Sequence, residues 1–156
     1  MSPRAAKVRF YIDADIRRLG IVLAGLRYDV TYPGDPGALI HKRQRQPCPI
    51  TATDILDEEW ITEAARRGWL IATRDSRIGE NRGEMAAVRD DGAKMVALNQ
   101  KDAATKWGQL EVFMTRWRGI EALTRAGPVH LARVAHGADA DSPRLTAAPP
   151  SASQLS

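Results

Sequence analysis

The feature that most constrains the fold of this chain is a pair of short apolar runs that each lead into an acid. Val8–Ile12 is β-branched and aromatic and is followed directly by Asp13. Trp69–Thr73 is a continuous apolar run and is followed, after one arginine, by Asp75. Such runs are typical of strands buried on both faces, which occur mostly in parallel sheets. Because parallel strands end at one edge of the sheet, where α/β folds bind ligands, we expect these acids to meet there.

Periodicity around these runs predicts the other elements of one α/β domain. Apolar residues spaced three and four apart from Ile16 to Leu26 predict a helix, and Asp29–Tyr32 predicts a short strand that completes a right-handed βαβ unit. The other predicted elements are a helix that begins at Asp57 and ends before Gly68, a helix around Arg82–Asp90, a strand at Lys94–Leu98, a long helix from Trp107 to about Leu123 and an edge strand at Val129–Val134.

Residues 33–53 interrupt this pattern and predict a long loop. The segment PGDPGALIHKRQRQPCPITAT holds four prolines and two glycines, and it carries a basic run that includes His41, Lys42, Arg43 and Arg45. Loops of this length inside a domain are usually functional or disordered. Residues 146–156 have the composition of a disordered tail, so residues 1–145 form the predicted domain.

Charge and composition limit the class of protein and of partner. The net charge is +4 and the isoelectric point is near 9.6, which fits a polyanionic partner such as RNA. The single Cys48 cannot form an internal disulfide, and no apolar run approaches the ~20 residues of a membrane span. The N-terminus also lacks the apolar segment of a signal peptide. We therefore expect a cytoplasmic protein that makes no membrane contact.

The clustered acids predict a site for a hard divalent cation. Carboxylates packed together repel each other unless a positive charge lies among them, and their oxygens suit Mg²⁺ or Mn²⁺. An alternative stays open for each cluster, because acids before a helix or in its first turn also serve as caps. The acids expected at the metal site are Asp13, Asp57 and Asp75, with Asp15 and Glu59 as further candidates, whereas Glu58 is expected on the surface.

Basic and hydroxyl groups near these acids predict contacts with a phosphate backbone. Basic side chains beside a metal site suit phosphate oxygens, although most arginines of most proteins are solvated surface charges. The expected substrate-binding residues are Thr73, Arg74, Arg77, Arg82, Lys42 and Arg43. Trp107 and Trp117 have the spacing of one helix face, so core packing is expected of both rather than base stacking.

Three segments, in this order, resemble the PIN-like domain of VapC-type toxins and their relatives: FYIDAD, LAGLRYDVTYPGD and DEEWITEAARRGWLIATRDSRI. The resemblance covers Lys7–Val134 and is strongest over Asp57–Ile78. It implies a single three-layer α/β/α domain with a mainly parallel central sheet. The acids of the family correspond in this chain to Asp13, to Asp57 with Glu59 as helper, and to Asp75, and no clear fourth acid follows.

The resemblance also implies a function, that of a metal-dependent endoribonuclease. Such an enzyme hydrolyses RNA phosphodiesters with Mg²⁺ or Mn²⁺ held by clustered carboxylates, and Arg74 or Arg77 would offset charge in the transition state. The same resemblance implies the toxin of a toxin–antitoxin pair, with an antitoxin protein as partner, and either a homodimer or a hetero-complex.

Two other functions stay open at the level of sequence. The acids could be relics in a non-catalytic module that holds RNA or a partner protein through its basic loop. YIDAD also resembles the first motif of haloacid dehalogenase-type phosphatases, in which the first Asp is the nucleophile. That motif continues with Thr or Val soon after the second Asp, whereas Ile16 and two arginines follow in this chain, which disfavours the phosphatase.

Overall fold

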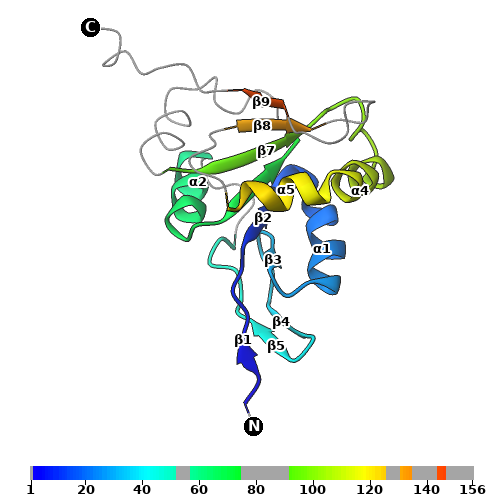
Figure 1. The fold of residues 1–156 in the computed structure, drawn as a ribbon. Helices are drawn as coiled ribbons and strands as arrows, with labels where there is room; N and C mark the ends of the chain where they lie inside the picture. Colours follow the sequence, from blue (N-terminus) through cyan, green and yellow to red (C-terminus); the bar gives the residue numbers. More distant parts are fainter. Residues whose placement is uncertain (1, 52–56, 75–91, 126–130, 135–143, 147–156) are drawn as a thin grey trace, which may run out of the picture.

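A six-stranded sheet lies at the centre of the computed structural model, which describes residues 2–51, 57–74, 92–125, 131–134 and 144–146 (Figure 1). Neighbouring strands pair parallel up to the last pair, which is antiparallel. In spatial order the strands are β3 (Val30–Thr31), β2 (Phe10–Ile12), β6 (Leu70–Thr73), β7 (Lys94–Leu98), β8 (Leu131–Val134) and β9 (Arg144–Thr146). The described residues therefore form an α/β fold with a mainly parallel sheet, as the sequence predicts.

The end of this sheet differs from the sequence prediction in two ways. Val129–Val134 is predicted to be an edge strand, but β8 pairs with β7 on one side and with β9 on the other. Residue 146 is predicted to begin a disordered tail, but Thr146 belongs to β9 and pairs with Leu131. Periodicity cannot identify a strand as short as β9, which is defined by its pairing partner. The rest of the predicted tail and the helix predicted around residues 82–90 lie outside the described residues.

Alternate residues of the central strands enter two buried clusters on opposite faces of the sheet. Successive side chains of a strand point to opposite faces, which divides the apolar residues of each strand between the two. The first cluster joins Phe10, Ile12, Leu70, Ala72, Val96 and Leu98 to α1 (Arg17–Leu26), α4 (Lys106–Thr115) and α5 (Trp117–Leu123). The second cluster joins Tyr11, Ile71 and Met95 to α2 (Asp57–Arg66). Helices therefore pack on both faces.

Helix α1 lies unusually close to the sheet because a glycine faces the strands. A Cβ at Gly20 would lie 2.8 Å from the Cβ of Tyr32, which is too short for a real side chain, and 3.0 Å from the Cβ of Ile12, which is a tight contact. The close contact anchors the helix against the last residue of β2. The short 3₁₀ turn η1 (Ala14–Ile16) connects that strand to α1, so the position of α1 also fixes the chain around Asp13.

Part of the loop predicted at residues 33–53 is a β-hairpin. β4 (Ala38–Ile40) and β5 (Arg43–Arg45) pair antiparallel, and β1 (Arg4–Ala5) pairs parallel with β5 to form a second, three-stranded sheet. His41 and Lys42 form its two-residue turn with φ of 48° and 64°. Positive φ at both central residues is the requirement of a type I′ turn, which matches the twist of the paired strands.

A buried ion pair holds this hairpin against the rest of the domain. Arg45 is 2% exposed, and its Nε lies 2.6 Å from Oδ2 of Asp35. Nη1 of Arg45 donates to the carbonyl oxygens of Ala24 and Arg27 at the end of α1, and the hydroxyl of Thr31 donates to Asp35. The prolines and glycines of this segment predict a loop because they are a local signal. The contact between Asp35 and Arg45, which are ten residues apart, leaves no trace in local composition.

The long helix predicted from Trp107 to Leu123 is two helices. α4 ends at Thr115 and α5 begins at Trp117, and Arg116 between them has φ of −98° and ψ of 6°. Because the helix breaks at this residue, a face inferred from continuous helical spacing does not extend across it. Trp117 packs against the first cluster, whereas Trp107 is 70% exposed. The prediction of a core position for Trp107 is therefore wrong.

Cys48 is a buried free thiol, as the presence of a single cysteine requires. Its burial raises the pKa of the thiol. Among the described residues, no helix is both long enough and apolar enough to cross a membrane.

Candidate functional site

Asp13 lies at the carboxyl end of β2, where the register of the sheet places it beside β6. Its backbone N–H donates to the carbonyl oxygen of Ala72 at 2.9 Å, which continues the parallel ladder by one residue. Its Oδ2 accepts a hydrogen bond from the hydroxyl of Thr73 at 2.8 Å, and its Oδ1 accepts from the N–H of Ala14 at 2.6 Å. The carboxyl group is therefore held in one orientation by two neighbouring segments of the chain.

Asp15 brings a second carboxylate to the same place. It is exposed, and its Oδ2 accepts from the backbone N–H of Arg74 at 3.3 Å. Burial, and after it the negative charge of Asp15, raise the pKa of Asp13 to about 7, although the hydrogen bonds from Thr73 and Ala14 oppose the rise. Two oxygen-rich groups whose charges repel form a donor set that a hard cation would stabilise.

The capping alternative for the first acids holds for Asp13, because its side chain caps the turn η1 through the N–H of Ala14. Capping does not exclude a role in binding. Each carboxylate oxygen has two lone pairs, so an oxygen that accepts one hydrogen bond can still contact a ligand. Among the described residues, the partners of the Asp13 carboxyl group are Ala14, Thr73 and the side chain of Asp15.

Of the predicted site residues, the structure brings together Asp13, Asp15, Thr73 and Arg74. Glu59 is exposed in the first turn of α2. Among the residues that the structure describes, no group of three or more His, Cys, Asp or Glu side chains could hold a metal. Four predicted positions are not described at the level of side chains: Asp57, which begins α2, and Asp75, Arg77 and Arg82, which lie outside the described residues.

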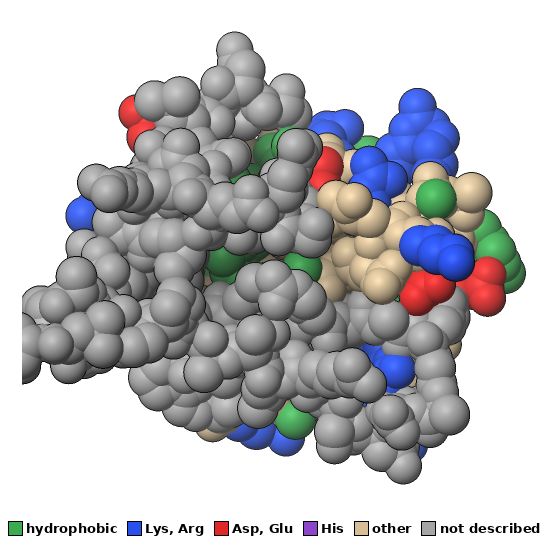
Figure 2. Space-filling view, turned by 90° about the horizontal axis from the view of Figure 1, so that it is seen from above, with side chains coloured by type: hydrophobic (Ala, Val, Ile, Leu, Met, Phe, Trp, Pro, Cys, Tyr) green, Lys and Arg blue, Asp and Glu red, His purple; other side chains and the backbone are tan. Residues whose placement is uncertain are grey.

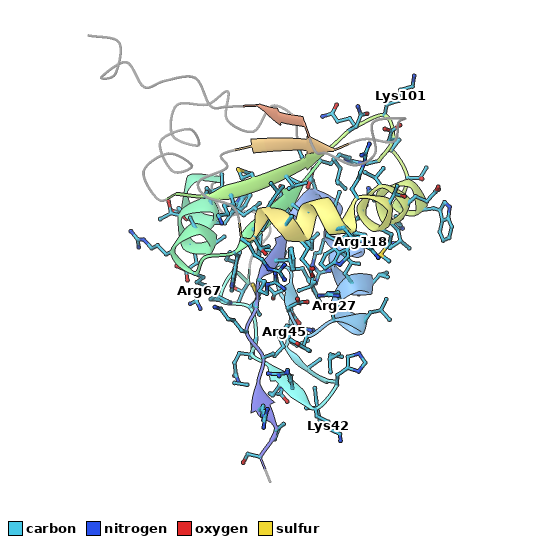
Figure 3. All side chains as sticks on the ribbon, viewed as in Figure 1. Arg27, Lys42, Arg45, Arg67, Lys101 and Arg118 are labelled. Atoms are coloured by element: carbon cyan, nitrogen blue, oxygen red, sulfur yellow. The ribbon has the colours of Figure 1, made fainter. Side chains whose placement is uncertain are left out.

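Lys42 and Arg43 lie on the β4–β5 hairpin, away from these acids. The hairpin contacts the C-terminal end of α1 through Arg45, whereas Asp13 and Asp15 precede the N-terminal end. The ten residues of α1 separate the two places by about 15 Å. Figure 3 shows Lys42 at the tip of the hairpin, near the end of the molecule where the N-terminus lies. The guanidinium of Arg43 lies 5.1 Å from the centre of the Tyr28 ring.

A pocket of about 720 Å³ opens beside Asp15, between the start of α1 and the start of α4. Figure 2 shows Lys and Arg side chains gathered together with acidic ones at the end of the molecule where α4 lies. Positive and negative groups therefore share this surface. The side chains with charge or aromatic area that line the pocket are Asp15, Arg17, Arg18, Arg74, Lys106 and Trp107.

The wall of this pocket that carries Trp107 is tied to the end of β6. Nη1 of Arg74 and the side-chain amide of Gln109 both donate to the carbonyl oxygen of Ala103, each at 3.2 Å. Thr105 caps α4 by accepting from the N–H of Gly108 at 2.9 Å. A Cβ at Gly108 would collide with the carbonyl oxygen of Asp102, so the tight entry into α4 requires glycine.

Four lining residues are absent from the predicted site: Arg17, Arg18, Lys106 and Trp107. A topological signal could have found them. A helix that follows a parallel strand starts at the carboxyl edge of the sheet, so the first turns of α1 and α4 both lie where β2 and β7 end. Helical spacing instead assigns Trp107 to the core. Spacing indicates on which face of a helix a residue lies, but not how close the residue is to the end of the helix.

One comparison with known proteins found a family match. The family model described as PIN like domain matches residues 9–100, more than half of the chain. The matched segment runs from β2 through β7 and contains Asp13, Asp15, Thr73 and Arg74, and it ends before α4. No curated protein and no solved structure matches the chain.

Proposed function

Because this chain belongs to the PIN-like domain family, whose fold is of the nuclease type, we propose that it is a metal-dependent endoribonuclease. The observation that carries the proposal is the pair of carboxylates of Asp13 and Asp15 at the carboxyl edge of a parallel sheet, next to a pocket with basic walls. Acids alone would repel RNA, and basic groups alone would only bind it. The combination suits a cation bridging protein and phosphate oxygens.

The donor set fits Mg²⁺ or Mn²⁺. The oxygens of Asp13 and Asp15 are hard ligands, and the raised pKa of Asp13 reflects its burial and the nearby negative charge of Asp15. We propose that Asp57 and Asp75, with Glu59 as a further candidate, complete the ligand set. When bound, the divalent cation would neutralise charge on the phosphate and lower the pKa of a water.

The residues around the acids have separate roles in this proposal. Thr73 and the N–H of Ala14 each hold one oxygen of Asp13, so the carboxylate is oriented before the substrate arrives. The backbone of Arg74 holds Asp15, and the side chain of Arg74 lines the pocket, where it meets phosphate oxygens. Arg77 and Arg82 are proposed to contact the same RNA strand.

The remaining parts of the proposal concern the whole protein. Two buried clusters on opposite faces of the sheet support a three-layer α/β/α arrangement. We propose a cytoplasmic toxin of the VapC type, whose partner is an antitoxin protein and which forms a homodimer or a hetero-complex. Lys42 and Arg43 lie on the hairpin at the far end of α1 from Asp13, so in this proposal they contact RNA that extends beyond the cleavage site.

The decisive experiment measures cleavage of RNA by the purified protein with and without Mg²⁺ or Mn²⁺. We expect Asp13→Asn to lower the cleavage rate at least about 100-fold, because the substitution removes an anionic ligand and retains the shape of the side chain. Glu111→Gln, on the exposed side of α4 and outside the pocket, is the matched control and keeps the wild-type rate. Circular dichroism verifies that both variants are folded.

Two results would contradict the proposal. Undiminished, metal-dependent cleavage by Asp13→Asn would show that the acids at this edge are not the catalytic ones. RNA binding that persists without any Mn²⁺ binding or cleavage by the wild-type protein would favour the non-catalytic binding module.

A further inference from the structure

Trp107 is exposed in a way that packing does not explain. The chain has four tryptophans. Trp60 and Trp69 are 5% and 6% exposed, and Trp117 packs against the first cluster, whereas Trp107 is 70% exposed in the first turn of α4. An indole ring left in water forgoes the burial that normally stabilises this side chain. Its place on the pocket wall gives the ring a surface that a ligand can cover.

The other side chains of the pocket indicate the charge of that ligand. Arg17 is held by the carbonyl oxygen of Pro33, and Arg74 by that of Ala103. Arg18 and Lys106 are exposed and form no hydrogen bond or ion pair within the described part of the chain. Next to the carboxylate of Asp15, the pocket therefore offers two cations held by carbonyl oxygens and two whose side chains have no such partner among the described residues. An anionic ligand with a flat aromatic part fits this arrangement.

A nucleotide unit has both properties, with a phosphate for the cations and a base for the ring. The pocket of about 720 Å³ has the size of a typical site for a small organic group. Only an unpaired base can lie on an indole ring, because in a duplex both faces of each base are covered by neighbouring bases. The ligand is therefore single-stranded at this point.

We propose that Trp107 stacks on one unpaired base of a bound nucleic acid strand, while Arg18 and Lys106 contact the adjoining phosphates. The inference rests on the proposed function for its substrate, and it adds the residue that fixes where along the strand the phosphate meets Asp13 and Asp15. Trp107 and Lys106 lie in α4, beyond residues 9–100, the segment that matches the family.

An exposed tryptophan can also anchor a protein partner, since tryptophan is enriched among the residues that dominate protein interfaces. The structure favours nucleic acid because the ring borders a hollow with several cations around it, and the fully buried centre of a protein interface is poor in charge.

The test measures binding of a ten-nucleotide single-stranded RNA in EDTA, where no cleavage takes place. We expect Trp107→Ala to weaken binding about 10-fold, because base–aromatic stacking contributes on this scale. Trp107→Phe restores most of the affinity. Met114→Ala is the matched control, since Met114 is 57% exposed on the same helix, lies outside the pocket and keeps the wild-type affinity.

Two further measurements make the interpretation specific to stacking. Stacked bases quench the fluorescence of indole, so the strand quenches the wild-type protein strongly and Trp107→Phe only weakly. A duplex of the same sequence binds wild type and Trp107→Ala equally. Unchanged affinity of Trp107→Ala for the single strand, or full quenching in Trp107→Phe, would overturn the inference, as would tight binding of a protein partner with no affinity for RNA.

The same variants separate failure of this inference from failure of the proposed function. If Trp107→Ala weakens RNA binding in EDTA but the wild-type protein cleaves no RNA with either metal, the stacking site is supported and the proposed ribonuclease is wrong. If cleavage depends on Asp13 while Trp107→Ala binds and cleaves like wild type, the ribonuclease stands and the stacking site is wrong.

Discussion

At the scale of single residues, Asp13 combines burial with a charge that burial disfavours. It is 9% exposed, and its pKa is raised to about 7 by burial and by the neighbouring charge of Asp15. The hydrogen bonds from Thr73 and Ala14 favour the ionised form but do not offset this rise. Binding of a cation would favour the ionised form further, so proton release and metal binding are coupled at this site.

This pKa predicts an unusual dependence of stability on pH. The ordinary pKa of the group is 3.8, so between about pH 4 and pH 7 the folded state holds a proton that the unfolded state has lost. The free energy of unfolding therefore falls as the pH rises through this window, by an amount on the order of a few kcal/mol. Asp13→Asn lacks the ionisation, and we expect it to be more stable than wild type at pH 8 and similar at pH 4.

Urea unfolding at pH 4, 6 and 8 measures this effect in the absence of metal. Glu111→Gln serves as the control and follows the wild-type profile. Equal slopes of stability against pH in wild type and Asp13→Asn would contradict the assignment. Added Mn²⁺ should raise the melting temperature of the wild type at pH 8 and leave Asp13→Asn unchanged.

At the scale of elements, the closeness of α1 to the sheet depends on Gly20. The chain offers a matched pair on this helix, because a Cβ at Gly20 meets Tyr32 at 2.8 Å while a Cβ at Gly25 meets nothing within 4 Å. Both substitutions by alanine gain the same helix propensity, which isolates the steric term.

We expect Gly20→Ala to lower the free energy of unfolding by about 1–3 kcal/mol, because α1 must move away from β2 and β3. Gly25→Ala should raise it by about 0.5–1 kcal/mol. Chemical denaturation of both variants provides the comparison. Equal effects of the two substitutions would mean that α1 lies farther from the sheet than described.

The position of the β4–β5 hairpin depends on the buried ion pair of Asp35 and Arg45. Replacing one partner leaves a charge buried without compensation, so we expect Arg45→Met to lower the free energy of unfolding by about 3–5 kcal/mol. Glu63 and Arg67 form an exposed ion pair with a similar N···O distance of 2.7 Å, so this pair isolates the effect of burial. Glu63→Gln should cost only about 0.3–0.5 kcal/mol, and a similar cost for both variants in urea unfolding would contradict the structure.

At the scale of the whole molecule, the sequence predicts the parts whose signal is local. The strands at Phe10–Ile12, Leu70–Thr73 and Lys94–Leu98 follow from apolar runs, and the place of Asp13 at the end of the first of them follows from the carboxyl edge of a parallel sheet. The hairpin at 38–45 could not be predicted from composition, because it is held by Arg45 reaching Asp35 and the end of α1. The core position predicted for Trp107 is wrong because helical spacing was continued across Arg116, where the helix breaks without a signature in the sequence.

The hydrogen bond between Thr73 and Asp13 joins residues 60 positions apart, and this distance in sequence has a consequence during synthesis. A chain leaves the ribosome from its N-terminus, so Asp13 emerges long before the strand that orients it, and Trp107 emerges later still. In the proposed ribonuclease, a growing chain would therefore contain Asp13 and Asp15 before the site around them had formed. The messenger would therefore be spared until β6 had emerged and paired with β2.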